Sequence, residues 1–386
     1  MHRSADVVII GAGIIGASIA WHLASRGCGT ILIVDSGQAA GSGSTSRATG
    51  GFRAQFASAV NIRMSLLSRE KLLRFADEVG EDPGYAPHGY LWVAHNEPAL
   101  QGLRHAQRLQ RDLGLTEARM LSPTEVMEIN PAVGPNGISG GAFCPTDGFI
   151  RPMKMLEGYL SDAGRRGVEL AVGEAVRELK LDERHRVRRV VTSRGEIDAG
   201  IVVNAAGAWA SRIAGLAGVE LPVTPMRRSV AITLPTSRLP DEMPMTIFTS
   251  DGFHLRVRDG RVLLLLPEVA REDPFDSSID EAWIRTVLRI AQERVPTISG
   301  LTIDRENCWS GLYEMSPDHH AIVGPAPGVE NFYLANGSSG HGVMHAPAMG
   351  QVVSELILDG RCSIDVTGLR PERFAEGRLN DASSLL

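Results

Sequence analysis

Residues 6–35 of this 386-residue chain constrain its fold more than any other segment. Residues 7–10 form a continuous β-branched run typical of a strand buried on both faces of a parallel sheet. Residues 14–26 have helical apolar spacing, and residues 31–34 predict a second buried strand. Together these residues predict a strand-helix-strand unit, and therefore a mixed α/β fold that contains a parallel sheet.

The turn between the first strand and the helix carries three spaced glycines, and Asp35 ends the second strand. Gly11 permits the tight turn, Gly13 lets a pyrophosphate approach the helix, and Gly16 allows close packing on the sheet. Asp35 can accept hydrogen bonds from an adenosine ribose and would repel a 2′-phosphate, which disfavours NADP. The pattern predicts an FAD or NAD site; the alternative is a glycine-rich turn without a ligand. We expect the same site to include Ile14, Ile15 and Ser36.

The charge balance argues against a nucleic-acid partner. The chain has 39 Lys and Arg against 45 Asp and Glu, which gives a formal net charge of −6. Residues 184–189 are rich in arginine, but they alternate with valine and follow two acidic residues, so a solvated hairpin is expected there.

The cysteines and the apolar segments bear on metal binding and on cellular compartment. The four cysteines are scattered and have no histidine at metal-ligand spacing, which predicts neither a metal site nor disulfides and fits a reducing cytoplasm. No segment reaches the roughly twenty apolar residues that a membrane span needs. Residues 7–21 are apolar but lack the pattern of a signal peptide.

Two patterns of predicted secondary structure alternate along the chain. Buried strands, glycine turns and amphipathic helices dominate residues 1–83, 147–218 and 318–386, which we assign to a nucleotide-binding domain. Short strands with turns, and one helix near residues 280–294, suggest a substrate domain built on an antiparallel sheet from residues 84–146 and 219–317.

A second glycine-rich loop distinguishes between the two dinucleotides. Residues 336–342 follow a strand at residues 332–335 and precede a helix expected to start near Ala346. Backbone N–H groups in such a loop can converge on an anion, and a reduced flavin carries negative charge at its N1/O2 edge. The loop therefore favours FAD; its alternative is a flexible surface turn.

Several motifs, in their order along the chain, resemble the D-amino-acid oxidase superfamily. They are the N-terminal fingerprint, the Ser/Thr-Arg loop at residues 43–47, Asp147-Gly148 with Pro152, residues 204–209, Ser316-Pro317-Asp318, and Gly340-His341-Gly342. Residues 311–320 are similar to the branch of sarcosine oxidase, dimethylglycine dehydrogenase and the β subunit of archaeal-type L-proline dehydrogenase.

The resemblance implies a GR2-type two-domain fold, FAD as cofactor, and oxidation of the C–N bond of a small amino acid or secondary amine. It implies further FAD contacts at Ser44, Thr45, Ser46, Arg47, Gly51, Val176, Ala205, Ala206, Gly207, Trp209, Gly311, Gly340, His341, Gly342, Val343 and Met344.

Three departures from the family bear on chemistry. Gly311 stands at the position of the cysteine that attaches FAD in monomeric sarcosine oxidases, and Cys308 is offset from it, so we expect non-covalent FAD. Residues 44–47 contain no histidine that could attach FAD instead. Residues 253–270 contain no lysine to match the one that activates dioxygen in those oxidases, which favours a dehydrogenase that passes electrons to a partner.

Four residues are candidates for the substrate site. Arg53 follows the Ser/Thr-Arg loop and could hold a substrate carboxylate, the alternative being an arginine paired with a surface acid. Tyr313 could donate to the same carboxylate or be a core tyrosine. His345 and His254 could face the substrate or be structural.

Two rival functions remain open at this level. Residues 50–56 share the Gly-Gly-x-Arg-x-Gln-Phe pattern of FAD-containing assembly factors, which would keep FAD without turnover. The chain could also be one subunit of a hetero-oligomeric amine dehydrogenase, while a nicotinamide-dependent dehydrogenase is disfavoured. Substrate identity, stereochemistry, electron acceptor and oligomeric state are not encoded in any motif.

Overall fold

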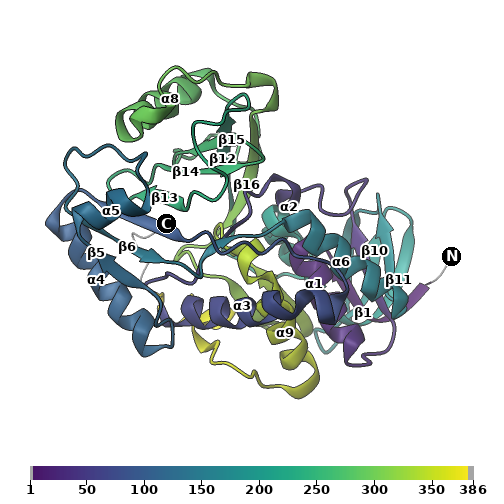
Figure 1. The fold of residues 1–386 in the computed structure, drawn as a ribbon. Helices are drawn as coiled ribbons and strands as arrows, with labels where there is room; N and C mark the ends of the chain where they lie inside the picture. Colours follow the sequence, from purple (N-terminus) through teal and green to yellow (C-terminus); the bar gives the residue numbers. More distant parts are fainter. Residues whose placement is uncertain (1–2, 381–386) are drawn as a thin grey trace.

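The computed structural model describes residues 3–380, which are organised around two large sheets (Figure 1). The first sheet has the strand order β17-β18-β11-β1-β2-β8, and the second has the order β16-β12-β15-β14-β13-β4-β6-β5. The predicted mixed α/β fold, with one largely parallel and one largely antiparallel sheet, is confirmed. Within these residues no helix is both long and apolar enough to cross a bilayer.

The first sheet contains the expected strand-helix-strand unit. β1 (Arg3–Ile10) pairs in parallel with β2 (Ile31–Asp35), and α1 (Ile14–Ser25) connects the two strands. Val7, Val8 and Ile9 are fully buried, which explains the continuous apolar run. Gly11 starts the turn with a φ of +117°, a conformation open to glycine and rarely adopted by other residues.

Strands from later in the chain complete the first sheet. β8 (Glu169–Val172) lies beside β2, while β11 (Gly195–Asn204) and β18 (Val329–Asn336) extend the parallel part beyond β1, and β17 (Ile322–Ala326) closes it antiparallel. Every cofactor-facing turn described below follows the carboxyl end of one of these parallel strands, which is where open α/β sheets bind ligands.

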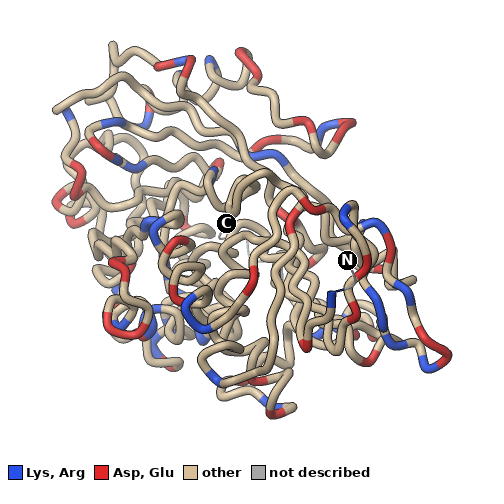
Figure 2. The backbone as a smooth tube through the Cα atoms, turned by 90° about the vertical axis from the view of Figure 1, so that its right-hand side faces the viewer, with Lys and Arg blue, Asp and Glu red and all other residues tan. Residues whose placement is uncertain are grey.

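The arginine-rich segment forms a hairpin on β11, as expected. Its strands are β9 (Val176–Leu181) and β10 (Val187–Thr192). Arg189 pairs with Glu196 at 2.7 Å and with Asp198 at 2.8 Å, and Figure 2 shows basic and acidic residues interspersed along the chain. β9 was not predicted from the sequence, because only Leu179 among its residues is buried.

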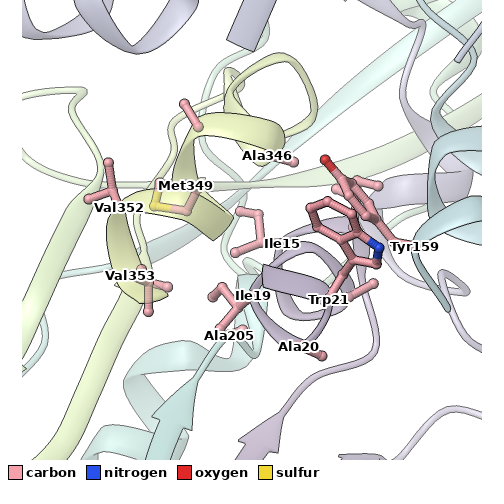
Figure 3. Packing of buried hydrophobic residues seen from close by; sticks show 14 of the residues in the cluster. Ile15, Ile19, Ala20, Trp21, Tyr159, Ala205, Ala346, Met349, Val352 and Val353 are labelled. Atoms are coloured by element: carbon pink, nitrogen blue, oxygen red, sulfur yellow. The ribbon is translucent and has the colours of Figure 1, made fainter. Parts of the chain in front are cut away.

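Four helices pack together against the first sheet. They are α1, α3 (Ala59–Val79), α6 (Pro152–Arg165) and α9 (Gly342–Asp359). Figure 3 shows Ile15 and Ile19 of α1 close to Met349 and Val353 of α9. Helix α9 begins four residues earlier than Ala346, because the end of the glycine loop itself forms the first helical turn.

The second sheet is antiparallel except for one pair, in which β4 and β13 run parallel. This pairing, which the sequence did not predict, joins two segments far apart in the chain. The strands in sheet order are β16 (Trp309–Met315), β12 (Thr224–Ile232), β15 (Arg261–Leu265), β14 (His254–Arg258), β13 (Met245–Phe248), β4 (Tyr90–Ala94), β6 (Gly140–Cys144) and β5 (Arg119–Leu121).

Three helices accompany the second sheet: α4 (Glu97–Asp112), α5 (Pro123–Ile129) and α8 (Glu281–Arg294). The expected capping box at Ser122 and Glu125 starts α5. Trp283 and Val287 of α8 belong to the same apolar cluster as Leu255 and Leu264 of the sheet, so α8 covers it as predicted.

The remaining elements are short. They are α2 (Ser44–Arg47), the pair β3 (Gly51–Phe52) and β7 (Gly148–Phe149), η1 (Gly207–Trp209), α7 (Ala210–Gly215), η2 (Pro296–Ile298), η3 (Arg305–Asn307), η4 (Thr367–Leu369) and η5 (Pro371–Arg373). The domain boundaries given above remain predictions, and residues 1–2 and 381–386 of the first domain lie outside the described residues.

A buried ion pair ties residues 367–380 to the turn after β16. Arg373 donates to Asp318 from Nε at 2.8 Å and from Nη2 at 2.9 Å, and Asn380 donates from Nδ2 at 2.9 Å. Although burial alone would raise its pKa, the hydrogen bonds from Arg373 and Asn380 hold the pKa of Asp318 well below its usual range. The turn that contains Asp318 is therefore held in place by residues that come later in the sequence.

Candidate active site

A cavity of about 1380 Å³ is lined by residues of both sheets. Pockets for drug-sized ligands occupy about 300–1,000 Å³, so this cavity can hold a ligand larger than those and a second small molecule. The lining comes from the turns after β1, β2, β11 and β18, from α2, and from one face of the second sheet.

The cradle at the N-terminus of α1 has no space for side chains. A β-carbon on Gly11 would collide with the carbonyl oxygen of Ala205, and one on Gly16 would collide with the carbonyl oxygen of Gly11. Gly11 and Gly13 line the cavity, whereas Gly16 does not and instead permits the close packing expected of it. Ile14 and Ile15 line the cavity beside them.

Asp35 lies at the carboxyl end of β2 and also lines the cavity. Its carboxylate accepts from the backbone N–H of Ala12 at 2.6 Å and of Gly37 at 2.7 Å, which fixes its orientation. Each carboxylate oxygen keeps a lone pair for another donor, such as a ribose hydroxyl. Ser36 and Val176 lie at the same end of the cavity lining.

The Ser/Thr-Arg loop forms α2, which connects the glycine cradle to the second sheet. Thr45 Oγ1 accepts from the N–H of Ile14 at 3.1 Å, and Ser44 Oγ donates to the carbonyl of Leu312 at 2.7 Å. Arg47 Nη1 donates to the carbonyl of Gly43 at 2.9 Å. Ser44, Thr45 and Arg47 line the cavity, while Ser46 does not and bonds back to its own loop.

The turn after β11 forms another wall. Ala205, Ala206, Gly207 and Trp209 line the cavity, and the Nδ2 of Asn204 holds the turn by donating to the carbonyl of Ala210 at 2.9 Å. The Ala205 carbonyl is the atom that excludes a side chain at Gly11. Gly311 lines the cavity where β16 approaches Arg47 of α2, and Gly51 lines it beside Tyr90 and Met245 of the second sheet.

The N-terminus of α9 faces the other end of the cavity, with Gly340, His341, Gly342, Val343 and Met344 in its lining. Because α9 starts at Gly342, the N–H groups of its first turn have no preceding turn to bond with and are available to an anion. Gly340 has a φ of +95°, and a β-carbon there would collide with the Tyr313 ring.

Arg53 is 4% exposed and lines the cavity, so it is a buried arginine and not one on the protein surface. Its Nη1 donates to the carbonyl of Gln55 at 3.1 Å, and its Nη2 lies 3.3 Å from His341 Nε2. The guanidinium stacks over Phe56 at 4.1 Å, and burial lowers the pKa of Arg53 to about 10, so it stays charged at neutral pH.

Of the other three candidate substrate-site residues, two line the cavity and one does not. Tyr313 and His254 line the cavity, but His345 does not; its Nε2 lies 2.8 Å from Ser65 Oγ inside the protein. His254 Nδ1 lies 2.8 Å from the carbonyl of Gly252, which can only accept, so that nitrogen carries the proton and Nε2 is an acceptor when the ring is neutral. Burial lowers the pKa of His254 to about 4, which keeps the ring neutral.

Sequence reasoning missed many residues of the cavity lining, and three of them bear polar side chains of particular interest. Tyr90 is buried, and a β-carbon on Gly51 would collide with its hydroxyl. Arg228 lies on β12, and Glu314 lies beside the glycine-rich loop at residues 336–342. Glu314 Oε1 accepts from the N–H of Ser338 at 3.2 Å, and burial raises its pKa. Glu314 lies within residues 311–320, which carry the family resemblance, whereas no motif marks Tyr90 or Arg228.

These features fit FAD in particular. The glycine cradle, the ribose acceptor Asp35 and the open helix N-terminus occupy one continuous cavity, as an elongated dinucleotide with an anionic ring system requires. Among residues 3–380 no cluster of three or more His, Cys, Asp or Glu side chains could hold a metal ion. Fold and site together define a flavin-dependent oxidoreductase.

Comparison with known proteins gives the family. The model of FAD dependent oxidoreductases (DAO) matches residues 6–356, and the chain belongs to this family. It is 30% identical to FAD-dependent oxidoreductase domain-containing protein 1 of Bos taurus, over 92% of this chain and 81% of that protein. It is 27% identical to mitochondrial dimethylglycine dehydrogenase of Homo sapiens, over 96% of this chain but 44% of that protein.

A solved structure supports the same assignment. The L-proline dehydrogenase from P. horikoshii superposes with a TM-score of 0.91 at 28% identity, over 98% of this chain and 100% of that one. FAD is therefore the cofactor of this protein, and the predicted resemblance to the DAO family is confirmed.

Proposed function

We propose that this protein oxidises the C–N bond of a small amino acid or secondary amine that carries a carboxylate, using non-covalently bound FAD. The observation that carries the proposal is the charged Arg53, buried in the cavity and in contact with His341 of the loop that precedes α9. A substrate carboxylate suits this guanidinium, because its two-pronged shape can donate two parallel hydrogen bonds to a carboxylate.

The remaining cavity groups suit an amine. Tyr313 and Tyr90 offer hydroxyls near Arg53, and burial raises the pKa of both tyrosines, so they stay protonated as donors. The Nε2 of neutral His254 can accept a hydrogen bond from the substrate N–H. Such an environment favours the uncharged amine, because Arg53 and Arg228 are among the arginines that line the same cavity.

Bound FAD supplies the acceptor for a hydride from the substrate α-carbon. The α C–H bond breaks as that hydride leaves, the N–H proton passes to solvent, and the product is an imine; water converts an open-chain imine to a carbonyl compound and an amine. Residues of this chain bind the carboxylate, orient the C–H bond and exclude water, and the first turn of α9 stabilises negative charge on the cofactor.

Two further parts of the proposal concern the cofactor and the acceptor. None of the four cysteines lines the cavity, which supports dissociable FAD. The absence of lysine from residues 253–270 supports transfer of electrons to a protein or quinone acceptor in preference to dioxygen.

An anaerobic screen tests the proposed function. Purified protein loaded with FAD is mixed with sarcosine, dimethylglycine, glycine, L-proline and D-proline, and the flavin absorbance near 450 nm is followed. Bleaching by at least one carboxylate-bearing amine is expected, and the reduced protein should reoxidise faster with a dye than with dioxygen. A flavin that no amine bleaches would indicate a flavoprotein without amine turnover, as in the assembly-factor alternative.

A further inference from the structure

One buried carboxylate lies behind two residues of the substrate site and outside the cavity itself. Asp147 is 0% exposed, stands between β6 and β7, and is not part of the cavity lining, whereas Arg53 and Tyr90 are. In the short ladder of β3 with β7, Phe52 pairs with Gly148, so the residue before Arg53 lies opposite the residue after Asp147. Any effect of Asp147 on a ligand must therefore pass through its neighbours.

The side chain of Asp147 fixes the segment that carries Arg53. Its Oδ1 accepts from the backbone N–H of Ala54 at 2.7 Å, and its Oδ2 accepts from that of Gln55 at 3.3 Å. The carbonyl of Gln55 in turn accepts from Arg53 Nη1 at 3.1 Å. An ionised carboxylate has two acceptor oxygens and no donor, which suits two adjacent N–H groups. Asp147 therefore orients the peptide groups against which the guanidinium is held.

The same residue also holds the strand that carries Tyr90. The Asp147 carbonyl accepts from the backbone N–H of Gly89 at 2.8 Å. In the amide orientation that satisfies both of its ends, the side-chain nitrogen of Gln55 donates to Asp147 Oδ2 at 3.3 Å and to the carbonyl of Tyr90 at 3.1 Å. The two wall segments that contribute Arg53 and Tyr90 are therefore joined through one residue outside the cavity.

The charges of these side chains also act on one another. Burial lowers the pKa of Arg53, and attraction by Tyr90 and Asp147 opposes that fall. Burial raises the pKa of Tyr90, and there Arg53 and Asp147 act in opposite directions. Asp147 therefore lies close enough to influence both cavity residues electrostatically.

We propose that Asp147 is a positioning residue for substrate binding, which holds Arg53 and Tyr90 in the arrangement that receives the substrate carboxylate. This inference rests on the proposed function and adds to it a residue that acts from outside the cavity. A guanidinium that is already held in place loses little rotamer entropy when a ligand binds, so loosening it weakens binding. The effect of Asp147 on a ligand is therefore expected only while Arg53 is present.

Methoxyacetate, the ether analogue of sarcosine, tests ligand binding without turnover. It is titrated into the FAD-loaded protein, and the shift of the visible flavin spectrum is followed. Asp147→Asn replaces one acceptor oxygen by an NH2 group that faces a backbone N–H, so the Kd for methoxyacetate should rise by about tenfold. With the amine that the anaerobic screen identifies, KM should rise by a similar factor, while kcat stays within about threefold of wild type and FAD is retained.

A double-mutant cycle separates positioning from a general loss of structure. In Arg53→Met the carboxylate contact is already lost, so adding Asp147→Asn should change the Kd for methoxyacetate by less than about threefold. Asp162→Asn is the matched control, because Asp162 is also a buried carboxylate, 8% exposed, that accepts from Trp21 Nε1 at 2.8 Å outside the cavity lining. The control should leave the Kd unchanged. Gln55→Met, which removes the amide link to Asp147 with little change in volume, serves if Asp147→Asn does not fold.

Two results would overturn the inference: an unchanged Kd and KM in Asp147→Asn or its substitute Gln55→Met, or losses of equal size in the wild-type and Arg53→Met backgrounds. The first would leave Asp147 as a residue of the fold alone, and the second would assign its effect to a general disturbance of the cavity. Failure of the proposed function differs from both, because then no amine bleaches the flavin of the wild-type protein itself.

Discussion

Arg53 shows how one buried charge connects sequence, packing and chemistry. Its aliphatic part and guanidinium pack on Phe56 and Trp92, which fixes the side chain, while its charge remains in the cavity. A flexible or surface arginine would lose rotamer entropy on binding substrate, whereas this one is already ordered.

At the residue scale we therefore predict a binding defect in Arg53→Met. KM for carboxylate-bearing amines should rise by about 10- to 100-fold, because a charge-assisted hydrogen bond is lost. Arg53→Lys should recover part of the loss, since lysine keeps the charge but not the fork. Steady-state kinetics measure the effect, and flavin absorbance checks that FAD is retained. The exposed arginine variant Arg108→Met on α4 is the control. An unchanged KM in Arg53→Met would remove Arg53 from this role.

The two helix N-termini that border the cavity are the elements that make it a cofactor site. Helix α1 starts after Gly11 and α9 starts after Gly340, and both glycines have positive φ values and no space for a β-carbon. Because Gly11 has no side chain, its backbone packs closely against that of Ala205, and a ligand can then approach the carboxyl ends of the strands.

At the element scale, Gly11→Ala should prevent retention of FAD. The added β-carbon would collide with the Ala205 carbonyl and would impose strain at a φ of +117°. The ratio of absorbance at 450 nm to that at 280 nm and the melting temperature measure the change. Gly102→Ala on exposed α4, where a β-carbon meets no atom within 4 Å, is the control and should be neutral or stabilising by up to about 1 kcal/mol. A yellow Gly11→Ala protein of normal stability would contradict this account.

Much of the first sheet and of the cofactor site could be predicted from the sequence, because glycine spacing and β-branched runs act locally. Gly11 to Asp35 and Gly340 to Met344 lie where they were expected. Arg228 could not be assigned to the site, because its importance depends on the pairing of β12 with β16. The parallel pairing of β4 with β13 is likewise a tertiary contact without a local signal. His345 was misplaced because a residue four positions after His341 need not face the same cavity once the helix starts at Gly342.

Across the whole molecule, two buried carboxylates respond to pH in opposite directions. Asp147 is 0% exposed and accepts from the N–H groups of Ala54 at 2.7 Å and Gln55 at 3.3 Å. Burial raises its pKa from 3.8 to about 7. Asp318, whose pKa is lowered, stabilises the fold above about pH 4 and loses that contribution in acid.

At this scale we predict that Asp147 makes the protein less stable as pH rises from about 4 to 7. The folded state holds the Asp147 proton more tightly than the unfolded state, so stability falls across this window and is constant above it. A shift of one pKa unit corresponds to about 1.4 kcal/mol, which makes about 4 kcal/mol an upper limit. Urea unfolding of the FAD-loaded protein between pH 4.5 and 8 measures the slope.

Asp147→Asn provides the comparison. It should reduce the slope and lower the stability at pH 5, because one amide oxygen cannot serve both backbone N–H donors as well as a carboxyl group does. A slope equal to that of the wild-type protein would assign the pH dependence to other groups.

The ion pair between Asp318 and Arg373 also affects the stage of synthesis at which a new chain can bind flavin. The first cofactor cradle is translated within the first sixteen residues, but the loop around His341 and the arginine that neutralises Asp318 emerge from the ribosome more than three hundred residues later. A nascent chain therefore lacks one wall of the cavity until these later residues have been made, and we expect cofactor capture to follow their synthesis. Ribosome complexes stalled before the loop around His341 is made should therefore carry no flavin.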